Sequence, residues 1–425
     1  MSSAASSNPN QFNNTNNFNK EIELNSERRR ISKIGLIRRR QIAITVVTGA
    51  SLTLLSLAQR KDSKSFDAFA NVNGNNKIEI NNNYDDDELS GKIDIGNRRL
   101  IAIGDVHGDF PAMMKALEIA EVMDKNGQWI GKDSVVVQVG DVLDRGDCEL
   151  AIFTKLMRLK KKARSEGGNV IVMNGNHEIM NVMGDFRYAT NGAYLECGEY
   201  LEKLKKKEIV NNNDNNIKIN NNVENNKENN KENDKTINDK KEEEMSPLKQ
   251  AEEKFRKTDP IQQGIRARRE LFQPGGVFAM KLSKHPTVLQ VGETIFAHAG
   301  VNPNHVNYGF DRINKEVSLW MQGKLKSPPS MIVESEGVVW TREYGGKDAG
   351  VKYEAEACRR LKSAMELTSE PQAKRLVIGH TPQTSGVNSG CKGAVWRVDV
   401  GASRGIYGGA VEVLEIKGNR VRVLS

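Results

Sequence analysis

Short apolar runs that end in glycine and a polar residue recur through the middle of the chain. They cover residues 98–105, 135–141 and 169–176, and each ends in Gly followed by Asp or Asn. Short β-branched and aliphatic runs bounded by turn residues are typical of buried strands. Between them, residues 111–124 and 148–166 carry apolar side chains at helical spacing. This β-α-β-α-β order predicts an α/β fold in which helices cover a sheet.

The C-terminal part of the chain is rich in further strand-like runs, at residues 286–292, 294–300, 374–380, 394–401 and 410–416. The pattern therefore predicts mixed sheets rather than a purely parallel one.

Two segments lack the apolar content of this core. Residues 1–97 are rich in Asn and Ser, and residues 207–245 form a low-complexity tract of Asn, Lys, Glu and Asp. Such segments have little apolar surface to bury, so we predict that both are disordered. Core sequence resumes after the second one, which we interpret as a surface-loop insertion. We expect one folded domain over residues 98–425, interrupted by this insertion.

The N-terminal segment has features of an organelle targeting sequence. Its first twenty residues contain no acidic side chain, and residues 41–59 are uncharged and follow Arg38–Arg40. These features favour targeting, which we assign to the plastid, with the mitochondrion as the alternative. A single membrane anchor over residues 41–59 is a competing interpretation, since the length is just adequate. Its Thr, Ser and Gly content makes the anchor less favoured, and a plain disordered tail is the third interpretation.

Composition narrows the class of protein. The 425 residues are 37% hydrophobic with a net charge of +8, and the two polar segments account for the low hydrophobic fraction. No stripe of Lys and Arg interleaved with aromatic residues appears, which argues against nucleic-acid binding. A mild basic excess suits an anionic substrate. The few scattered cysteines have no metal-type spacing, and we expect four unpaired thiols in a reducing compartment: Cys148, Cys197, Cys358 and Cys391.

Polar side chains gather where the predicted strands end, which is where open α/β sheets bind ligands. Their oxygen and nitrogen donors suit borderline divalent metals. In Asp105-x-His107 the period of two brings both side chains to one side of the strand end. Asp141 can bridge two metal ions, and a two-metal centre can activate a water and clamp phosphoryl oxygens. The later strand ends and the third block supply the remaining ligand-type residues: Asn176, His298 and His380.

Three further residues of these blocks suit phosphate chemistry. Arg145 has a planar guanidinium fork that matches phosphate oxygens. His177 can act as a general acid that protonates a leaving oxygen. Asp144 can pair with His177 and keep it cationic.

The blocks GDVHG, GDVLDRG and GNHE, followed by HAG and GHTP, resemble the signatures of the phosphoprotein phosphatase group of calcineurin-like metallophosphoesterases. The resemblance covers residues 98–206 and 246–425 and implies a four-layer α-β-β-α sandwich with mixed sheets. It implies that the first metal ion is bound by Asp105, His107 and Asp141. It implies that the second is bound by Asp141, Asn176, His298 and His380. It also implies a proton donor, its orienting partner and two phosphate ligands: His177, Asp144, Arg145 and Arg342.

The stretches IMNVMGDFRYAT and RRELFQPGGVFAMKL narrow the resemblance to the bacterial-type Shewanella-like protein phosphatases of plants, algae and protists. The familiar eukaryotic phosphatases carry HGG where this chain has His298-Ala299-Gly300. Their C-terminal toxin-contacting segment is not evident here. The resemblance therefore implies insensitivity to microcystin-type inhibitors.

We predict a metal-dependent protein phosphatase that hydrolyses phosphoserine and phosphothreonine by attack of hydroxide activated by two metal ions. The expected cofactors are two divalent ions, Mn being favoured and Fe or Zn also compatible. The expected partner is a phosphorylated protein, and the sequence does not indicate an oligomeric state. The alternatives are a dinucleoside-polyphosphate or other small phosphoester hydrolase, a phosphotyrosine-directed phosphatase, and an inactive scaffold that binds phosphorylated partners.

Other residues near the blocks have structural interpretations. Glu178 is expected to cap a helix or support the ligands, and Asp109 to support the metal shell through its turn. Asp185 and Arg187 fit either a substrate wall or a salt-bridged loop. The remaining four are expected to be ordinary or core residues: His285, His305, Trp340 and Trp396.

Overall fold

The computed structural model describes residues 89–223, 259–352 and 354–425, with the backbone alone described for residues 208–223. All of these residues belong to one unit, Asp85–Ser425. The uncharged run 41–59, and with it the targeting and anchor interpretations, lies outside the described residues. Within the described part of the chain, no helix is both long and apolar enough to cross a membrane.

One sheet has five strands in the order β11-β10-β2-β3-β4. The predicted strands β2 (Leu100–Ile103), β3 (Val135–Gln138) and β4 (Asn169–Val172) lie parallel to one another. β10 (Val413–Lys417) pairs antiparallel with both β2 and β11 (Arg420–Leu424). The sheet is therefore mixed, as the sequence predicts.

The second sheet has six strands in the order β1-β5-β6-β7-β9-β8. The central strands β6, β7 and β9 are parallel, whereas β5 and β8 run antiparallel to their neighbours β6 and β9. The first strand, β1, precedes the predicted start of the core at residue 98 and pairs parallel with β5. In chain order the strands are β1 (Lys92–Ile93), β5 (Val288–Val291), β6 (Thr294–Ala297), β7 (Arg375–Ile378), β8 (Asn388–Gly390) and β9 (Val395–Arg397).

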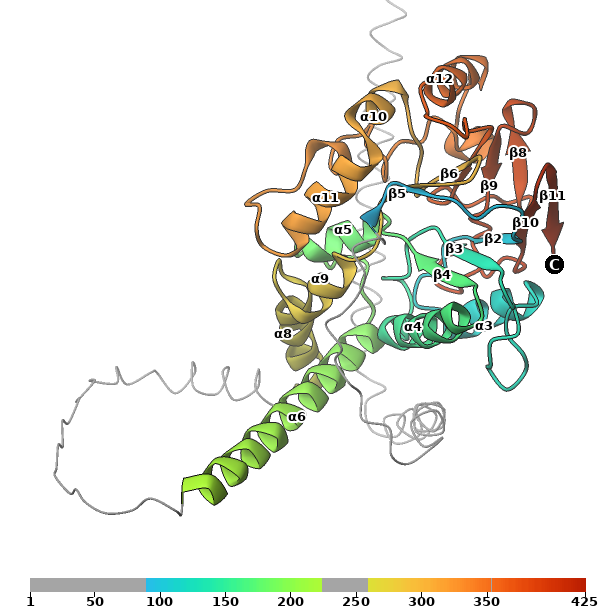
Figure 1. Cartoon of the computed structure of the whole chain (residues 1–425). Coiled ribbons are helices and arrows are strands. Elements are labelled where there is room, and N and C mark those ends of the chain that lie inside the picture. Colours follow the sequence, from blue (N-terminus) through green and yellow to red (C-terminus); the bar gives the residue numbers. More distant parts are fainter. Residues whose placement is uncertain (1–88, 224–258, 353) are drawn as a thin grey trace, which may run out of the picture. The chain divides into compact units, whose positions relative to one another are not determined.

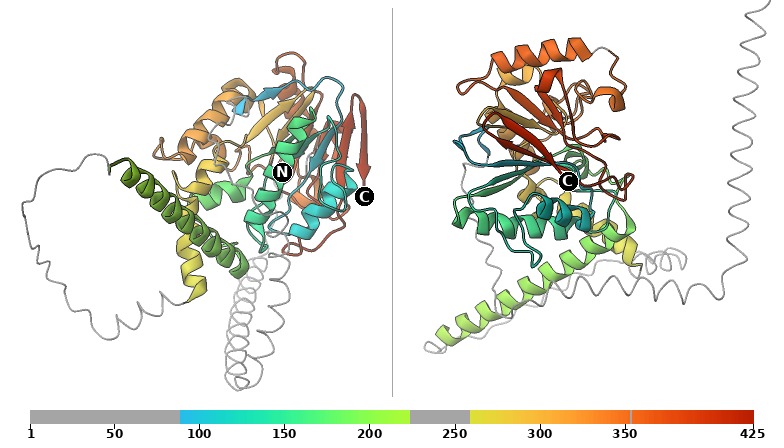
Figure 2. Two further views of the ribbon diagram at one scale, coloured as in Figure 1. Left: turned by 60° about the horizontal axis from the view of Figure 1, so that its bottom comes forward. Right: turned by 90° about the vertical axis from the view of Figure 1, so that its right-hand side faces the viewer.

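The period of two along each strand divides its side chains between two cores. In β2, Leu100 and Ala102 belong to a cluster that also contains Leu289 and Phe296 of the other sheet. The alternate residues Ile101 and Ile103 belong to a second cluster together with helical side chains. The sheets therefore stack face to face and helices cover their outer faces, which confirms the four-layer α-β-β-α sandwich (Figure 2, right).

Helices α3 and α4 cover the five-stranded sheet, and helices α11 and α12 lie on the side of the six-stranded sheet (Figure 1). α3 begins at the predicted position because Asp109 caps it and Pro111 occupies its first turn. The covering helices are α3 (Phe110–Ile119), α4 (Glu149–Ser165), α10 (Pro303–Tyr308), α11 (Phe310–Met321) and α12 (Glu354–Glu366). Three short 3₁₀ helices lie in the C-terminal half: η3 (Ser330–Ile332), η4 (Gly346–Ala349) and η5 (Cys391–Gly393).

Four helices lie around the end of the sandwich where the GNHE block begins α5 (Figure 1). They are α5 (Asn176–Val182), α6 (Asn191–Val223), α8 (Pro260–Phe272) and α9 (Val277–Leu282). α6 packs along α8 and continues to Val223. Helix therefore extends into the low-complexity tract that the sequence predicts to be disordered from residue 207. The rest of that tract lies outside the described residues.

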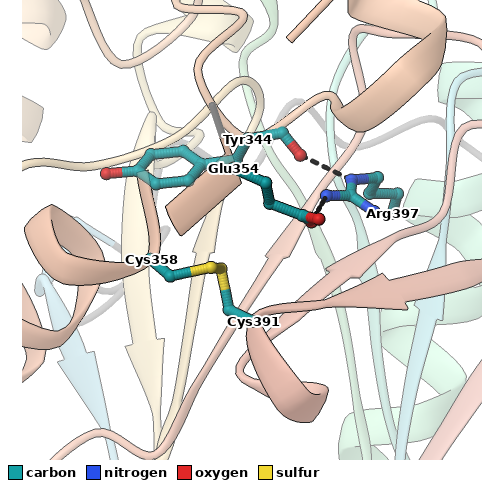
Figure 3. Close-up of a disulfide and its surroundings, with 5 residues drawn as sticks. All are labelled: Tyr344, Glu354, Cys358, Cys391 and Arg397. Atoms are coloured by element: carbon teal, nitrogen blue, oxygen red, sulfur yellow. Dashed lines mark hydrogen bonds and ion pairs between the residues drawn. A yellow bond between two sulfur atoms is a disulfide. The ribbon is translucent and has the colours of Figure 1, made fainter. Parts of the chain in front are cut away.

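Two of the four cysteines are joined, which corrects the expectation of four unpaired thiols. Cys358 of α12 and Cys391 of η5 form a disulfide, 33 residues apart in sequence (Figure 3). Cys148 and Cys197 are free. The spacing could not reveal the pair, because the two sulfur atoms meet only through the packing of α12 against η5, which follows β8.

Candidate metal centre and substrate cavity

The ligand-type side chains converge at the carboxyl ends of strands from both sheets. β2 leads into Asp105 and His107, β3 into Asp141, and β6 and β7 into His298 and His380. Nε2 of His107 and Nε2 of His298 lie 3.8 and 3.2 Å from Oδ2 of Asp141. Asp141 belongs to both groups of converging donor atoms, which are His107, Asp141 and His177, and Asp141, His298 and His380. It therefore occupies the position that a bridging ligand requires.

The backbone of these strand ends is strained. His107, Asp141, Asp144 and His380 have φ values of 41°, 56°, 67° and 68°. Each non-glycine residue in the left-handed region costs on the order of 1 kcal/mol, and such residues cluster at functional sites. The surrounding hydrogen bonds must therefore over-determine the conformation of these loops.

Glu178 supplies much of that support. Its buried carboxylate accepts hydrogen bonds from the backbone N–H groups of Asp141, Val142, Leu143 and Gly175, at 2.7–3.1 Å. Burial and the charge of Asp141 raise the pKa of Glu178 to about 7. The expected capping and supporting role of Glu178 is confirmed, because its side chain also completes the capping box of α5.

The histidines are oriented so that their lone pairs face Asn176. One ring nitrogen of His298 donates to the carbonyl oxygen of Val139 at 3.0 Å, and one of His380 to that of Trp340 at 3.1 Å. The other nitrogens lie 2.8 and 2.9 Å from Oδ1 of Asn176. A neutral imidazole that donates through one nitrogen has only a lone pair on the other. Acceptors that converge in this way form a ligand set for a cation.

The buried carboxylates Asp105, Asp141 and Asp399 also lie close to one another. Burial and the negative charges of Asp399 and Asp141 raise the pKa of Asp105 well above its usual range. The buried Oδ1 atom of Asp105 has no hydrogen-bond partner among the described residues. Burial alone would raise the pKa of Asp141, but the neighbouring His298 and His177 hold it well below its usual value. An orphaned carboxylate oxygen beside oxygen and imidazole donors fits divalent metal ions.

His177 forms a buried pair with Asp144. Its Nδ1 atom lies 2.6 Å from Oδ2 of Asp144. Burial by itself would lower the pKa of His177, but the charges of Asp141 and Asp144 outweigh it and raise that pKa. The cationic form, which carries a proton on Nε2, is therefore favoured.

Both predicted arginines line a cavity of about 460 Å³ that residues predicted as metal ligands also line. The Arg145 guanidinium lies 4.6 Å from the ring centroid of Tyr188, and its buried Nε has no hydrogen-bond partner in the described part of the chain. Arg342 donates through Nη1 to Oγ1 of Thr381 at 3.2 Å. Two cationic forks thus reach the cavity from opposite halves of the sequence.

Three residues whose roles the sequence analysis considered also line the cavity: Asp185, Arg187 and Trp340. Asp185 and Arg187 line the cavity and also form an ion pair at 2.7 Å, so both interpretations hold. Trp340 is half-buried: it packs against the core, as expected, and it also lines the cavity, which was not expected. Trp396 does pack against the core between the sheets.

All the sequence-predicted site residues meet here. Seven of them line the cavity: His107, Asp141, Arg145, Asn176, His177, Arg342 and His380. Asp105, Asp144 and His298 stand behind them and contact His380, His177 and Asn176 respectively.

Sequence reasoning missed Asp399 and Arg268. Asp399 lines the cavity, contacts Asp105, and has a pKa that burial raises to about 6. It follows the strand-like run 394–398, without the Gly that precedes Asp105 and Asp141, so its position at a strand end is the signal that could have found it. Arg268 is buried behind Asp144. Helical spacing places it on the buried face of α8 with Gly264 and Leu271, whereas Arg269 is exposed, but that spacing does not reveal its partners.

Comparisons with known proteins agree with this geometry. Residues 98–384 match the family model of the calcineurin-like phosphoesterases. Shewanella-like protein phosphatase 2 of Arabidopsis thaliana is 37% identical over 323 residues, which cover 75% of each chain. Shewanella-like protein phosphatase 1 of Plasmodium berghei is 26% identical over 76% of this chain and 70% of its own.

The fold also has a solved counterpart. The crystal structure of a cold-active protein-tyrosine phosphatase from a psychrophilic Shewanella species superposes with a TM-score of 0.50 at 18% identity, covering 82% of this chain and 86% of its own. At that identity the likeness shows the fold alone. The family match, the Arabidopsis relative and the converging ligand set together show that the chain belongs to the Shewanella-like protein phosphatases, metal-dependent phosphatases of the calcineurin-like phosphoesterase family.

Proposed function

We propose that this phosphatase acts on phosphoserine and phosphothreonine in proteins and uses two divalent metal ions. The first is held by Asp105, His107 and Asp141, and the second by Asp141, Asn176, His298 and His380. When bound, such ions supply an activated water and positive charge against the phosphoryl oxygens. The orphaned oxygen of Asp105 and the lone pairs that face Asn176 support this assignment.

The observation that carries the substrate class is the contact between His177 and Asp144. The alkoxide that leaves from phosphoserine or phosphothreonine is strongly basic, so its departure needs a proton from the enzyme. Asp144 fixes the imidazole through Nδ1 at 2.6 Å and leaves Nε2 to carry that proton. Nε2 also lies 3.9 Å from Oδ2 of Asp141, the residue assigned here as the bridging ligand, and this short distance supports the proposed role of His177.

The two arginines are assigned to the phosphoryl group. Arg145 has a free donor at Nε and is held in place by the ring of Tyr188. Arg342 lines the same cavity. Guanidinium forks bind two phosphoryl oxygens at once, and they stabilise the charge that develops during transfer.

A substrate panel with added Mn²⁺ tests the proposal. Phosphoserine, phosphothreonine and phosphotyrosine peptides of one sequence would be compared with a dinucleoside polyphosphate at equal concentration. We expect the first two peptides to be hydrolysed with the highest kcat/KM. A preference for phosphotyrosine, or turnover of the dinucleotide alone, would contradict the proposed substrate class.

Manganese is the proposed metal, because hard oxygen donors and imidazole nitrogens make up the ligand set and thiolates are absent from it. Fe and Zn accept the same donors. Reconstitution of chelator-treated protein with each metal, followed by metal analysis of the active fraction, distinguishes them. Activity restored by Zn²⁺ and not by Mn²⁺ would contradict the assignment.

Plastid targeting by residues 1–97 is proposed from the acid-free first twenty residues and the uncharged run that follows Arg38–Arg40. A fluorescent fusion of residues 1–97 should accumulate in plastids. Accumulation in mitochondria, or retention on a membrane, would support one of the two alternatives instead.

A further inference from the structure

A fully buried arginine lies behind the proton donor. Arg268 of α8 has 0% exposure. Its Nη1 and Nη2 atoms donate to the two carboxylate oxygens of Glu149 at 2.5 and 3.1 Å. Nη2 also donates to Oδ1 of Asp144 at 3.0 Å. Arg268 does not line the substrate cavity, so it can act on the reaction only through its partners.

Those partners connect Arg268 to His177 along two routes. Asp144 accepts from Arg268 through Oδ1 and contacts Nδ1 of His177 through Oδ2, so each carboxylate oxygen has its own partner. Nε of Arg268 donates to Oδ1 of Asn181 at 2.8 Å, and Nδ2 of Asn181 donates to the carbonyl oxygen of His177 at 2.9 Å. The guanidinium therefore fixes both the side-chain partner and the backbone of His177.

The surroundings hold the guanidinium itself in place. Its central carbon lies 5.7, 6.0 and 5.1 Å from the ring centroids of Phe186, Tyr194 and Phe272. These rings exclude water, which strengthens each hydrogen bond of the network. Burial by itself would lower the pKa of Arg268, but the charge of Glu149 outweighs burial and raises that pKa above its usual value. The residue therefore remains a cation.

We propose that Arg268 is a positioning residue, which holds Asp144 and thereby orients His177 for protonation of the leaving oxygen. The inference deepens the proton-donor role of His177 proposed above and rests on it. Because Arg268 belongs to α8 and Tyr194 to α6, both of these packed helices are part of the support of the proton donor.

The leaving group separates a positioning role from a merely structural one. The phenolate of p-nitrophenyl phosphate departs without protonation, whereas a serine alkoxide does not. A misplaced His177 should therefore slow hydrolysis of a phosphoserine peptide far more than hydrolysis of the aryl ester. General loss of folded protein would lower both rates by the same factor.

Arg268→Met leaves two buried carboxylates without their cation, which can unfold the protein. The double variant R268M/E149Q removes one charge of each sign and is the main test. We expect its kcat for the phosphoserine peptide to fall about 100-fold, within the range of general-acid contributions. The kcat for p-nitrophenyl phosphate should fall less than about 3-fold. Arg269→Met, at the exposed neighbouring position, is the matched control and should leave both rates unchanged.

His177→Asn distinguishes failure of this inference from failure of the proton-donor role. If H177N lowers both rates equally, the proposed role of His177 is wrong. If H177N shows the leaving-group dependence and R268M/E149Q lowers both rates equally or neither, only the role of Arg268 is overturned. Adding R268M/E149Q to H177N should cause no further selective loss on the phosphoserine peptide, and a full multiplicative loss would also overturn it.

Discussion

Two buried arginines, Arg268 and Arg397, do not line the cavity and differ in what they hold. Arg268 binds two carboxylates that are themselves fully buried. Arg397 of β9 is 6% exposed and donates through Nε to the carbonyl oxygen of Tyr344 at 2.5 Å. Its only described carboxylate partner is Glu354, at 2.8 Å, whose side chain is half exposed (Figure 3). The ion pairs of Arg268 are therefore fully buried, whereas the ion pair of Arg397 is partly exposed to solvent.

The two arginines also support different functions. Arg268 stands behind the proton donor, whereas Arg397 anchors the loop in which Tyr344 follows Arg342 by two residues. The Tyr344 hydroxyl donates to the carbonyl oxygen of Val301 at 2.7 Å, which fixes the same loop from its other side. We therefore expect loss of the Arg268 network to lower kcat, and loss of Arg397 to weaken phosphate binding.

The largest effect should follow from Asp144→Asn. An amide keeps the shape of the side chain but removes the charge that both His177 and Arg268 contact. We expect kcat for a phosphoserine peptide to fall by about 10²–10⁴-fold, the full contribution of a general acid. Steady-state kinetics on this peptide and on p-nitrophenyl phosphate would check it. Equal losses on both substrates would show that Asp144 serves folding alone.

An intermediate effect should follow from Arg397→Met. The loop that carries Arg342 loses the hydrogen bond to the Tyr344 carbonyl, a contribution of about 1.5–3 kcal/mol for a charged donor. If part of that loss reaches Arg342, KM for the phosphopeptide should rise several-fold, while the ratio of kcat on the two substrates stays constant. Arg342→Met sets the upper limit of this change. If Arg397→Met instead lowered kcat for the phosphoserine peptide more than kcat for p-nitrophenyl phosphate, the proposed difference in function between Arg268 and Arg397 would be wrong.

The smallest kinetic effect should follow from loss of the disulfide. Cys358 lies one helical turn from Glu354, so the Cys358–Cys391 bond braces the helix that holds the partner of Arg397 (Figure 3). The double variant C358S/C391S should lose about 2–4 kcal/mol of unfolding free energy, as typical of disulfides. Denaturant titration measures this. KM should change about two-fold or less, and a large change in kcat would show that the disulfide acts on the chemistry directly.

The side chains that the sequence predicts as metal ligands converge in the structure, and they could be singled out because their signal is local. Asp105, His107, Asp141 and Asn176 each follow an apolar run directly, and strand ends of parallel strands meet at one edge. The four-layer fold follows from the same runs together with the family resemblance.

The supporting contacts could not be predicted, because their partners are distant in sequence. Arg268 lies 124 residues from Asp144, and its neighbour Arg269 has the same residue type and the opposite exposure. Cys358 and Cys391 likewise meet only after α12 has packed against η5. Helix α6 enters a tract whose composition predicts disorder, and it packs along α8, a tertiary partner that composition does not show.

The central claim is that the converging strand ends form a two-metal hydrolytic centre. The most direct measurement strips the full chain with a chelator, removes the chelator, and titrates Mn²⁺ while following hydrolysis of a phosphoserine peptide. We predict no turnover without metal, recovery that saturates near two equivalents, and no recovery in Asp141→Asn. Unchanged turnover by the metal-free protein, or full recovery in D141N, would contradict the account.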